Sequence, residues 1–232
     1  MIHIGGLERN TLLDYPGSVS ATIFVAGCDL RCLFCQNSSL VEGTVQEIRE
    51  EDVLAFLKKR KGKLTGVCIS GGEPTLQADL PDFIADVKSL GYMVKLDTNG
   101  TEPEMLRILA AKGLVDYVAL DIKTSRTHYR ELCNIDLDME KVGESVRLLI
   151  DGSFPEYEFR TTVVAEFYDD TTAREVGEWL SGARRYYLQN FVDTNTTFVG
   201  RGVLHGRSRE EIEAYADILR KTISEVSLRG IE

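Results

Sequence analysis

The sequence lacks an apolar run long enough to span a bilayer, and its first residues, MIHIGGLERN, contain no signal-peptide hydrophobic core. It also lacks an excess of positive charge, since 27 Lys and Arg oppose 37 Asp and Glu, for a net charge of −10. A nucleic-acid binder needs a basic face, and an anionic membrane surface would repel this chain. We therefore expect a cytoplasmic protein that binds neither nucleic acid nor membrane.

Linkers, charge runs and low-complexity tracts are also missing, so nothing divides the 232 residues into separate units. The cysteines are few, odd in number and clustered, which does not resemble a secreted disulfide framework. In a reducing compartment such a cluster indicates metal binding or redox chemistry. We predict one α/β domain over residues 1–232, a length sufficient for a sizeable core.

What is present is a repeated alternation of apolar, strand-like runs with amphipathic, helix-like stretches. Repeated βα units build a parallel sheet with right-handed crossovers. The predicted strands are 20–27, 66–70, 93–97, 117–121, 156–164 and 186–191, and the predicted helices are 51–61, 80–90, 104–112, 140–150, 173–180 and 210–225.

Polar residues follow nearly every predicted strand, among them the segment GGEPT at 71–75, Asp97, Asp121 and Lys123. Barrel enzymes build their sites from several strand ends at one face, whereas an open doubly wound sheet concentrates its ligand at one switch point. The distribution therefore favours a partial (β/α)6 barrel of parallel strands.

Three cysteines follow the first predicted strand with C-x3-C-x2-C spacing, at Cys28, Cys32 and Cys35. A structural zinc site needs a fourth ligand, but Cys68 lies inside a strand, Cys133 is expected in a loop with no partner, and the three histidines are isolated. Three thiolates suit a cubane iron–sulfur cluster with one iron left open. An open coordination position is typical of a catalytic site.

The segment CDLRCLFC resembles the cluster motif of the radical S-adenosylmethionine (SAM) enzymes, and GGEP follows on the next strand, where that family binds the amino group of SAM. In the family, SAM chelates the fourth iron. LLDYPG, LDTNG and LVDYVALDIKT are further similar to the activating proteins of anaerobic ribonucleotide reductase and to pyruvate formate-lyase activating enzyme. The likeness covers about residues 12–191, which implies a core there and a C-terminal loop and helix at 192–232.

This resemblance implies a radical SAM fold and a glycyl-radical activase, which abstracts hydrogen from a glycine of a partner enzyme, here expected to be anaerobic ribonucleotide reductase. Its cofactors would be a 4Fe–4S cluster and SAM, with reduced flavodoxin or ferredoxin as electron donor. The cluster ligands would be Cys28, Cys32 and Cys35. The implied SAM-binding residues are Phe34, Gln36, Gly71, Gly72, Glu73, Asp97, Asp121, Lys123, Arg160 and Gln189, with a monovalent cation near Asp97 and Asp121.

Several of these residues have simpler interpretations. Glu73 would instead anchor a turn, Asp97 would begin the turn DTNG, and Asp121 with Lys123 would form a surface ion pair worth under about 1 kcal/mol. The sequence also departs from the family, because Gln36 stands where many activases carry His. Gln189 or Asn190 replaces a sixth-strand His of pyruvate formate-lyase activating enzyme.

Two alternative functions remain open. One is a radical SAM enzyme acting on a small molecule, like the 7-carboxy-7-deazaguanine synthases, although LLDYPG before the cluster favours the activases. The other is a non-catalytic iron–sulfur redox protein, which would need the cysteines but not GGEP, Asp121 or Lys123.

Overall fold

A single sheet of eight strands, arranged in chain order from β1 to β8, organises the computed structural model, which describes residues 1–231. Strands β2 to β8 run parallel, and β1 pairs antiparallel with β2. The strands are β1 (Ile4–Thr11), β2 (Ser20–Val25), β3 (Gly66–Gly71), β4 (Met93–Thr98), β5 (Tyr117–Asp121), β6 (Glu156–Val163), β7 (Arg185–Asn190) and β8 (Glu225–Arg229).

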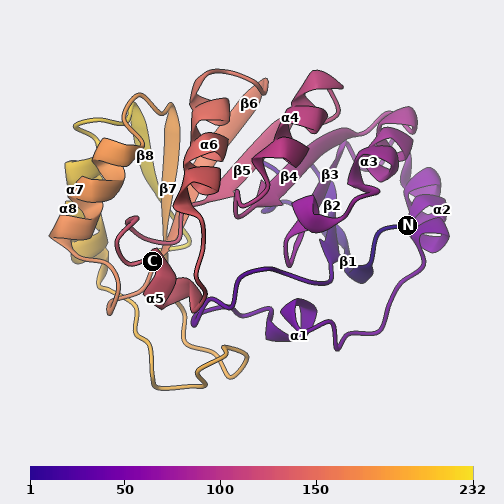
Figure 1. The fold of residues 1–232 in the computed structure, drawn as a ribbon. Helices are drawn as coiled ribbons and strands as arrows, with labels where there is room; N and C mark the ends of the chain where they lie inside the picture. The colour runs from indigo at the N-terminus through magenta and orange to yellow at the C-terminus, as the bar shows by residue number, and fades with distance from the viewer. Residues whose placement is uncertain (232) are drawn as a thin grey trace.

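Helices occur in the connections between the parallel strands. Most of them lie along the outer side of the sheet, and the two short ones lie beyond one end of it (Figure 1). They are α1 (Ser38–Val41), α2 (Glu50–Arg60), α3 (Leu80–Ser89), α4 (Pro103–Ala111), α5 (Tyr129–Cys133), α6 (Met139–Ile150), α7 (Asp170–Trp179) and α8 (Arg209–Leu219), with a 3-10 turn at Pro74–Leu76.

The strand order never reverses, which is the arrangement of a barrel rather than of a doubly wound sheet. The six predicted strands correspond to β2–β7, so the expected α/β fold with parallel strands is confirmed. The sheet is not closed, because β1 and β8 stand at its two edges without pairing to each other. The carboxyl ends of seven parallel strands therefore meet at one end of a partial barrel.

The two faces of the sheet differ in chemistry because side chains alternate along a strand. On β4, Val94 and Leu96 are fully buried and join the core cluster formed with the helices. Their neighbours Lys95 and Asp97 point to the concave face, where they pair with each other. Burying an aliphatic side chain contributes about 1.5–3 kcal/mol. The outer face therefore stabilises the fold, and the polar inner face is available for a site.

Two strands lie outside the predicted set. The sequence of β1, IGGLERNT, is rich in glycine and polar residues, so it carries little alternation. The helix predicted over 210–225 ends at Leu219, and the chain turns into β8 within the expected C-terminal loop and helix. Thr222 Oγ1 donates to the carbonyl of Gly177 at 2.7 Å, a tertiary contact at this turn that helical periodicity does not encode.

None of the helices formed by residues 1–231 combines the length and the apolar character needed to cross a membrane.

Candidate active site

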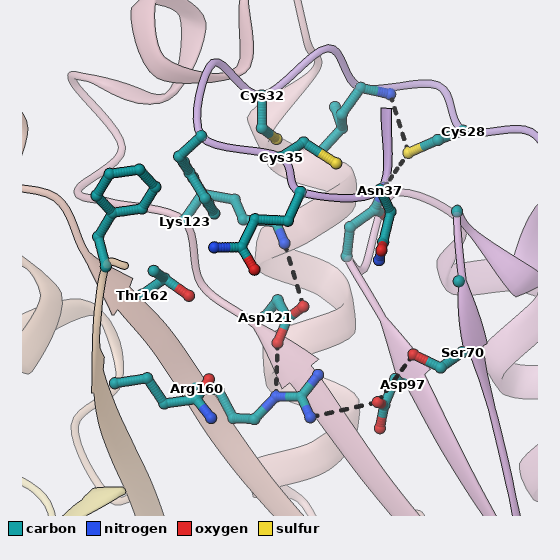
Figure 2. Close-up of a pocket in the computed structure, with 18 of the residues that line it drawn as sticks. Cys28, Cys32, Cys35, Asn37, Ser70, Asp97, Asp121, Lys123, Arg160 and Thr162 are labelled. Atoms are coloured by element: carbon teal, nitrogen blue, oxygen red, sulfur yellow. Dashed lines mark hydrogen bonds and ion pairs between the residues drawn. The ribbon is translucent and has the colours of Figure 1, made fainter. Parts of the chain in front are cut away.

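The cysteine loop, residues 27–37, leaves β2 and crosses the carboxyl end of the sheet. Cys28, Cys32 and Cys35 all line a cavity of about 580 Å³ (Figure 2). Backbone contacts outside the loop fix its middle, because the amides of Arg31 and Leu33 donate to carbonyls at the end of α5 at 3.1 and 3.0 Å. The loop thus depends on distant segments for its shape.

Without a metal the three cysteine side chains are protonated thiols. Burial raises the pKa of Cys28 to about 12 and also raises the pKa of Cys35. The pKa of Cys32 is raised by its contact with the thiol of Cys133 and by burial. Because metal ligands must be thiolates, binding a metal here has to release protons.

The spacing of the three sulfurs disfavours a single metal ion. Within residues 1–231 no three His, Cys, Asp or Glu side chains gather closely enough to hold one ion. The ligands of a cubane bind separate irons, so they need not converge on one point. The donor set therefore fits an iron–sulfur cluster better than mononuclear zinc.

Two glycines form the wall beside the cysteine loop. Gly71 has φ +113°, and a Cβ on Gly72 would lie 2.0 Å from the carbonyl oxygen of Gly27. The amide of Glu73 donates to that same carbonyl at 2.8 Å. Glycine is required here because the two loops approach so closely that no side chain fits. Both glycines line the cavity, as the ligand-binding prediction requires.

Glu73 points away from the cavity and into the protein. Its carboxylate accepts hydrogen bonds from the amide of Thr75 at 3.0 Å, from Thr98 Oγ1 at 2.7 Å and from the amide of Asn99 at 2.6 Å. Complete burial raises its pKa to about 7, while these donors oppose the rise. Of the two roles considered for Glu73, the geometry favours anchoring the turn to the end of β4.

Four charged residues form a connected group at the strand ends opposite the cysteines. Arg160 donates through Nε to Asp121 at 2.7 Å and pairs through Nη1 with Asp97 at 3.3 Å. Lys123 Nζ lies 3.1 Å from the other oxygen of Asp121 (Figure 2). We call Asp97, Asp121, Lys123 and Arg160 the strand-end charges. They come from β4, from β5 and the residues just after it, and from β6.

The strand-end charges are shielded from solvent, so the interpretation as a surface ion pair is wrong. The side chains of Lys123 and Asp97 are only 16% and 13% exposed. Burial alone would raise the carboxyl pKa values, but Arg160 lowers those of Asp97 and Asp121 below their usual range. Burial would likewise lower the pKa of Lys123, yet Asp121 raises it. All four groups therefore stay charged at neutral pH.

The predicted monovalent cation would share its place with Arg160. That guanidinium already bridges Asp97 and Asp121 and supplies the positive charge between them. Within the described residues 1–231, no three or more His, Cys, Asp or Glu side chains are grouped so that they could hold a metal ion. The cation stays a prediction drawn from resemblance.

The remaining predicted residues also line the cavity. The ring of Phe34 lies 5.9 Å from Lys123 Nζ. Gln36 donates from Nε2 to the carbonyl of Val192 at 2.8 Å, so its amide holds the loop after β7. Gln189 and Asn190 both line the cavity, but both amide atoms of Asn190 are bonded to the backbone of Arg207, just before α8. Gln189 is therefore the better candidate for a ligand contact.

Several lining residues escaped sequence reasoning. Ser70 Oγ donates to Asp97 at 3.0 Å, and the amide nitrogen of Asn99 donates to Asp29 at 2.9 Å, which ties DTNG to the cysteine loop. Arg229 lines the cavity from β8. Ser70 could have been found from its position at the end of a predicted strand, where the other site residues also stand. Arg229 could not, because it lies in β8, which was not predicted. Asp14, Thr98, Thr162, Phe191 and Gly230 also line the cavity.

The expectation that Cys133 lies in a loop without a partner is wrong. It ends the short helix α5, is fully buried, and places its Sγ 3.7 Å from Sγ of Cys32. The pairing spans 101 residues of sequence, so no local pattern could indicate it. Cys68 is buried in β3, as expected for a core residue.

Comparison with known proteins agrees with this geometry. The model of the radical SAM superfamily matches residues 22–180. The Methanocaldococcus jannaschii protein named "Putative glycyl-radical enzyme activating enzyme MJ1227" is 31% identical over 98% of this chain and 96% of its own. A 7-carboxy-7-deazaguanine synthase of Thermococcus kodakarensis is 35% identical, but over only 44% of this chain and 48% of its own length.

Among solved structures, Streptococcus suis SuiB bound to S-adenosylmethionine superposes with a TM-score of 0.68 at 16% identity, covering 88% of this chain and 48% of SuiB. At that identity the likeness concerns the fold alone. The extent of the family match, together with the cysteine spacing and the partial barrel, shows that the chain belongs to the radical SAM superfamily. Within it, the M. jannaschii protein named as a putative glycyl-radical enzyme activating enzyme is similar over 98% of the chain.

Proposed function

We propose that this protein is a radical SAM activase that generates a glycyl radical on a partner enzyme. The observation that carries the proposal is the cavity itself, which has three thiols on one wall, buried charges on the opposite wall, and lining residues from both edges of an open sheet. Asp14 lines it near the β1 edge, and Arg229 lines it from β8 at the other edge. A site that reaches both edges can admit a polypeptide loop.

Different residues of the cavity would bind the cluster and SAM. Cys28, Cys32 and Cys35 would hold the 4Fe–4S cluster, which when reduced supplies the electron that cleaves SAM. The strand-end charges would orient the zwitterionic methionine part of SAM, because they offer ammonium and guanidinium groups beside carboxylates in a shielded place. Phe34 offers an apolar face to the adenine, and Gly71 and Gly72 offer backbone atoms without side-chain obstruction.

The partner we propose is anaerobic ribonucleotide reductase, with reduced flavodoxin or ferredoxin as electron donor. The support is the likeness of LLDYPG, LDTNG and LVDYVALDIKT to its activating proteins. The full-length similarity to an activating-enzyme relative supports the activase class and leaves the partner as our proposal.

The experiment labels the abstracted hydrogen. The partner, carrying deuterium on its glycine residues, is incubated anaerobically with the reconstituted protein, dithionite and SAM. An organic doublet in the electron paramagnetic resonance (EPR) spectrum should grow on the partner, and deuterium should appear in the 5′-deoxyadenosine product. A Cys32→Ala variant, which lacks a cluster ligand, should give neither signal.

A different labelling result would favour the alternative that the protein acts on a small molecule. The partial similarity to the T. kodakarensis synthase supports considering this alternative. If 5′-deoxyadenosine gains label from a deuterated small metabolite, and no protein radical forms on any glycyl-radical partner tested, the activase proposal is wrong. Activity with pyruvate formate-lyase but not with the reductase would retain the class and change the partner.

A further inference from the structure

A fourth cysteine, Cys133, contacts the cysteine loop on the side that faces away from the cavity. The Sγ atoms of Cys133 and Cys32 lie 3.7 Å apart, within the distance of an S–H···S hydrogen bond. Both residues are free cysteines, and Cys133 is fully buried. Cys133 does not belong to the cavity lining, so its thiol reaches the sulfur of Cys32 without reaching the space in front of the cluster ligands.

This contact is built by the backbone on both sides of Cys32. The amide of Arg31 donates to the carbonyl of Cys133 at 3.1 Å, and the amide of Leu33 donates to the carbonyl of Leu132 at 3.0 Å. The two hydrogen bonds hold the end of α5 in register with the loop. These two backbone hydrogen bonds therefore hold the Cys133 thiol next to the sulfur of Cys32.

The ends of α5 are themselves fixed. Asn134 follows Cys133 with φ 50°, a left-handed conformation that ends the helix at that residue. At the other end, the hydroxyl of Tyr129 accepts from the amide of Lys123 at 3.0 Å. The helix thus connects the cysteine loop to the segment that carries Lys123, and displacement of Cys133 would disturb both.

The three cluster sulfurs have different donors. Cys28 receives the amide of Leu30 at 3.4 Å and more distantly Asn99 Nδ2 at 3.9 Å, and Cys35 has a backbone amide donor two residues further along. The hydrogen-bond partner of the Cys32 sulfur is the thiol of Cys133. Backbone donors come with the fold of the loop, whereas a thiol donor can be removed or replaced by substitution.

We infer that Cys133 is a positioning residue whose S–H donates to the Cys32 sulfur and raises the reduction potential of the cluster. A thiolate ligand can only accept, so Cys133 must be the donor once Cys32 binds iron. A hydrogen bond to a ligand sulfur stabilises the more negative, reduced cluster more than the oxidised one. The inference rests on the proposed cluster site.

The test measures reduction of the reconstituted cluster at controlled potentials, without SAM or partner, followed by EPR. In Cys133→Ala the ratio of reduced to oxidised cluster at a fixed potential should fall several-fold, where tenfold corresponds to about 59 mV. Cys133→Ser keeps a donor and should recover most of the ratio. Cys68→Ala is the matched control, because Cys68 is equally buried but does not line the cavity, and it should leave the ratio unchanged.

A second pair guards against failure of the Ala variant to assemble. Cys133→Thr and Cys133→Val have nearly the same shape, but only Thr can donate, so the Val variant should have the lower ratio. Equal ratios for donor and non-donor variants, in whichever pair holds the cluster, would overturn the inference. If the wild-type cluster forms but never cleaves SAM, the proposed function fails while this comparison of potentials still stands.

Discussion

The cysteine loop and the strand-end charges face each other across one cavity, but different forces hold them (Figure 2). The loop is irregular backbone whose shape depends on hydrogen bonds to α5 and to the segment after β7. The strand-end charges stand on regular strands and hold one another through ion pairs at 2.7–3.3 Å. Changes in the loop should therefore affect what the protein binds, whereas changes in the charges should affect both binding and stability.

The largest effect is expected in the loop. Replacing Cys28, Cys32 or Cys35 by Ala should abolish the cluster, because each supplies one of the three thiolates, and Cys133, the other cysteine beside the loop, does not line the cavity. Iron and sulfide analysis after anaerobic reconstitution gives the measurement. Cys68→Ala and Cys133→Ala should retain about four irons per chain, since three thiolates with one open iron suit a cubane. Loss of the cluster in Cys133→Ser and Cys133→Thr as well as in Cys133→Ala would contradict the prediction of three cysteine ligands.

The Cys28→Ala and Cys35→Ala variants should unfold close to wild type, within about 1 kcal/mol in the apo form, because these two partly exposed side chains lie on a loop rather than in the main core. Urea unfolding of apoprotein checks this. A severe loss of stability would contradict the distinction between loop and strands.

Arg160→Met should have the largest effect on stability. It removes the shared partner of Asp97 and Asp121, and we expect a loss of about 3 kcal/mol, the lower end of the range for breaking a buried pair. The lower end applies because Lys95 and Lys123 still pair with these carboxylates. Urea unfolding measures it, and SAM binding should weaken in parallel.

The matched control for Arg160 is Arg174→Met. Arg174 pairs with Asp170 at 3.6 Å, but its side chain is 59% exposed, so its loss should change stability by under about 0.5 kcal/mol. Equal effects of the two substitutions would mean that the strand-end charges contribute no more than surface pairs do.

Lys123→Met separates binding from stability. Asp121 keeps Arg160 as a partner, so the fold should lose little, while SAM should bind at least about tenfold more weakly, or roughly 1.4 kcal/mol. Calorimetric titration with SAM on the reconstituted protein measures it. Lys88→Met is the control, because Lys88 pairs with Asp116 at 2.7 Å without lining the cavity. Unchanged SAM affinity in Lys123→Met would leave this lysine with a purely structural role.

The last prediction concerns Glu73, whose buried carboxyl anchors the segment after β3 to the end of β4. Its pKa is raised by burial to about 7, so the folded state retains a proton that the unfolded state loses near pH 4.5. Stability should therefore decrease as pH rises through this window, by about 1.4 kcal/mol between pH 6 and 8. Unfolding of wild type and Glu73→Gln across that range checks the slope. An equally steep slope in the Gln variant would assign it to another group.

The loop could be predicted from sequence because its chemistry is local. Cys28, Cys32 and Cys35 lie within eight residues, and their spacing, together with GGEP on the next strand, indicates a cluster. The six parallel strands could also be predicted from the sequence, because burial of their outer faces requires runs of apolar residues. The charged residues at the strand ends could be predicted individually. The ion pairs among them could not, because Arg160 and Asp97 are 63 residues apart in the sequence.

What sequence could not supply depends on side-chain direction and on distant contacts. Glu73 stands in the GGEP motif, yet its carboxylate turns inward because four donors from Thr75, Thr98 and Asn99 meet there. Cys133 lies in a segment with no motif, and only the fold places it, at the end of α5, next to Cys32. Arg229 reaches the cavity from β8, whose five residues follow a helix directly and carry too little pattern to be predicted.

The central claim is that the cavity holds SAM between the cysteine loop and the strand-end charges. The most direct test is the EPR spectrum of the reduced, reconstituted protein with and without SAM, followed by analysis of the products. SAM should shift the spectrum of the cluster, and methionine and 5′-deoxyadenosine should form in equal amounts. A spectrum that is identical with and without SAM, together with no cleavage, would contradict the claim and favour a non-catalytic iron–sulfur protein.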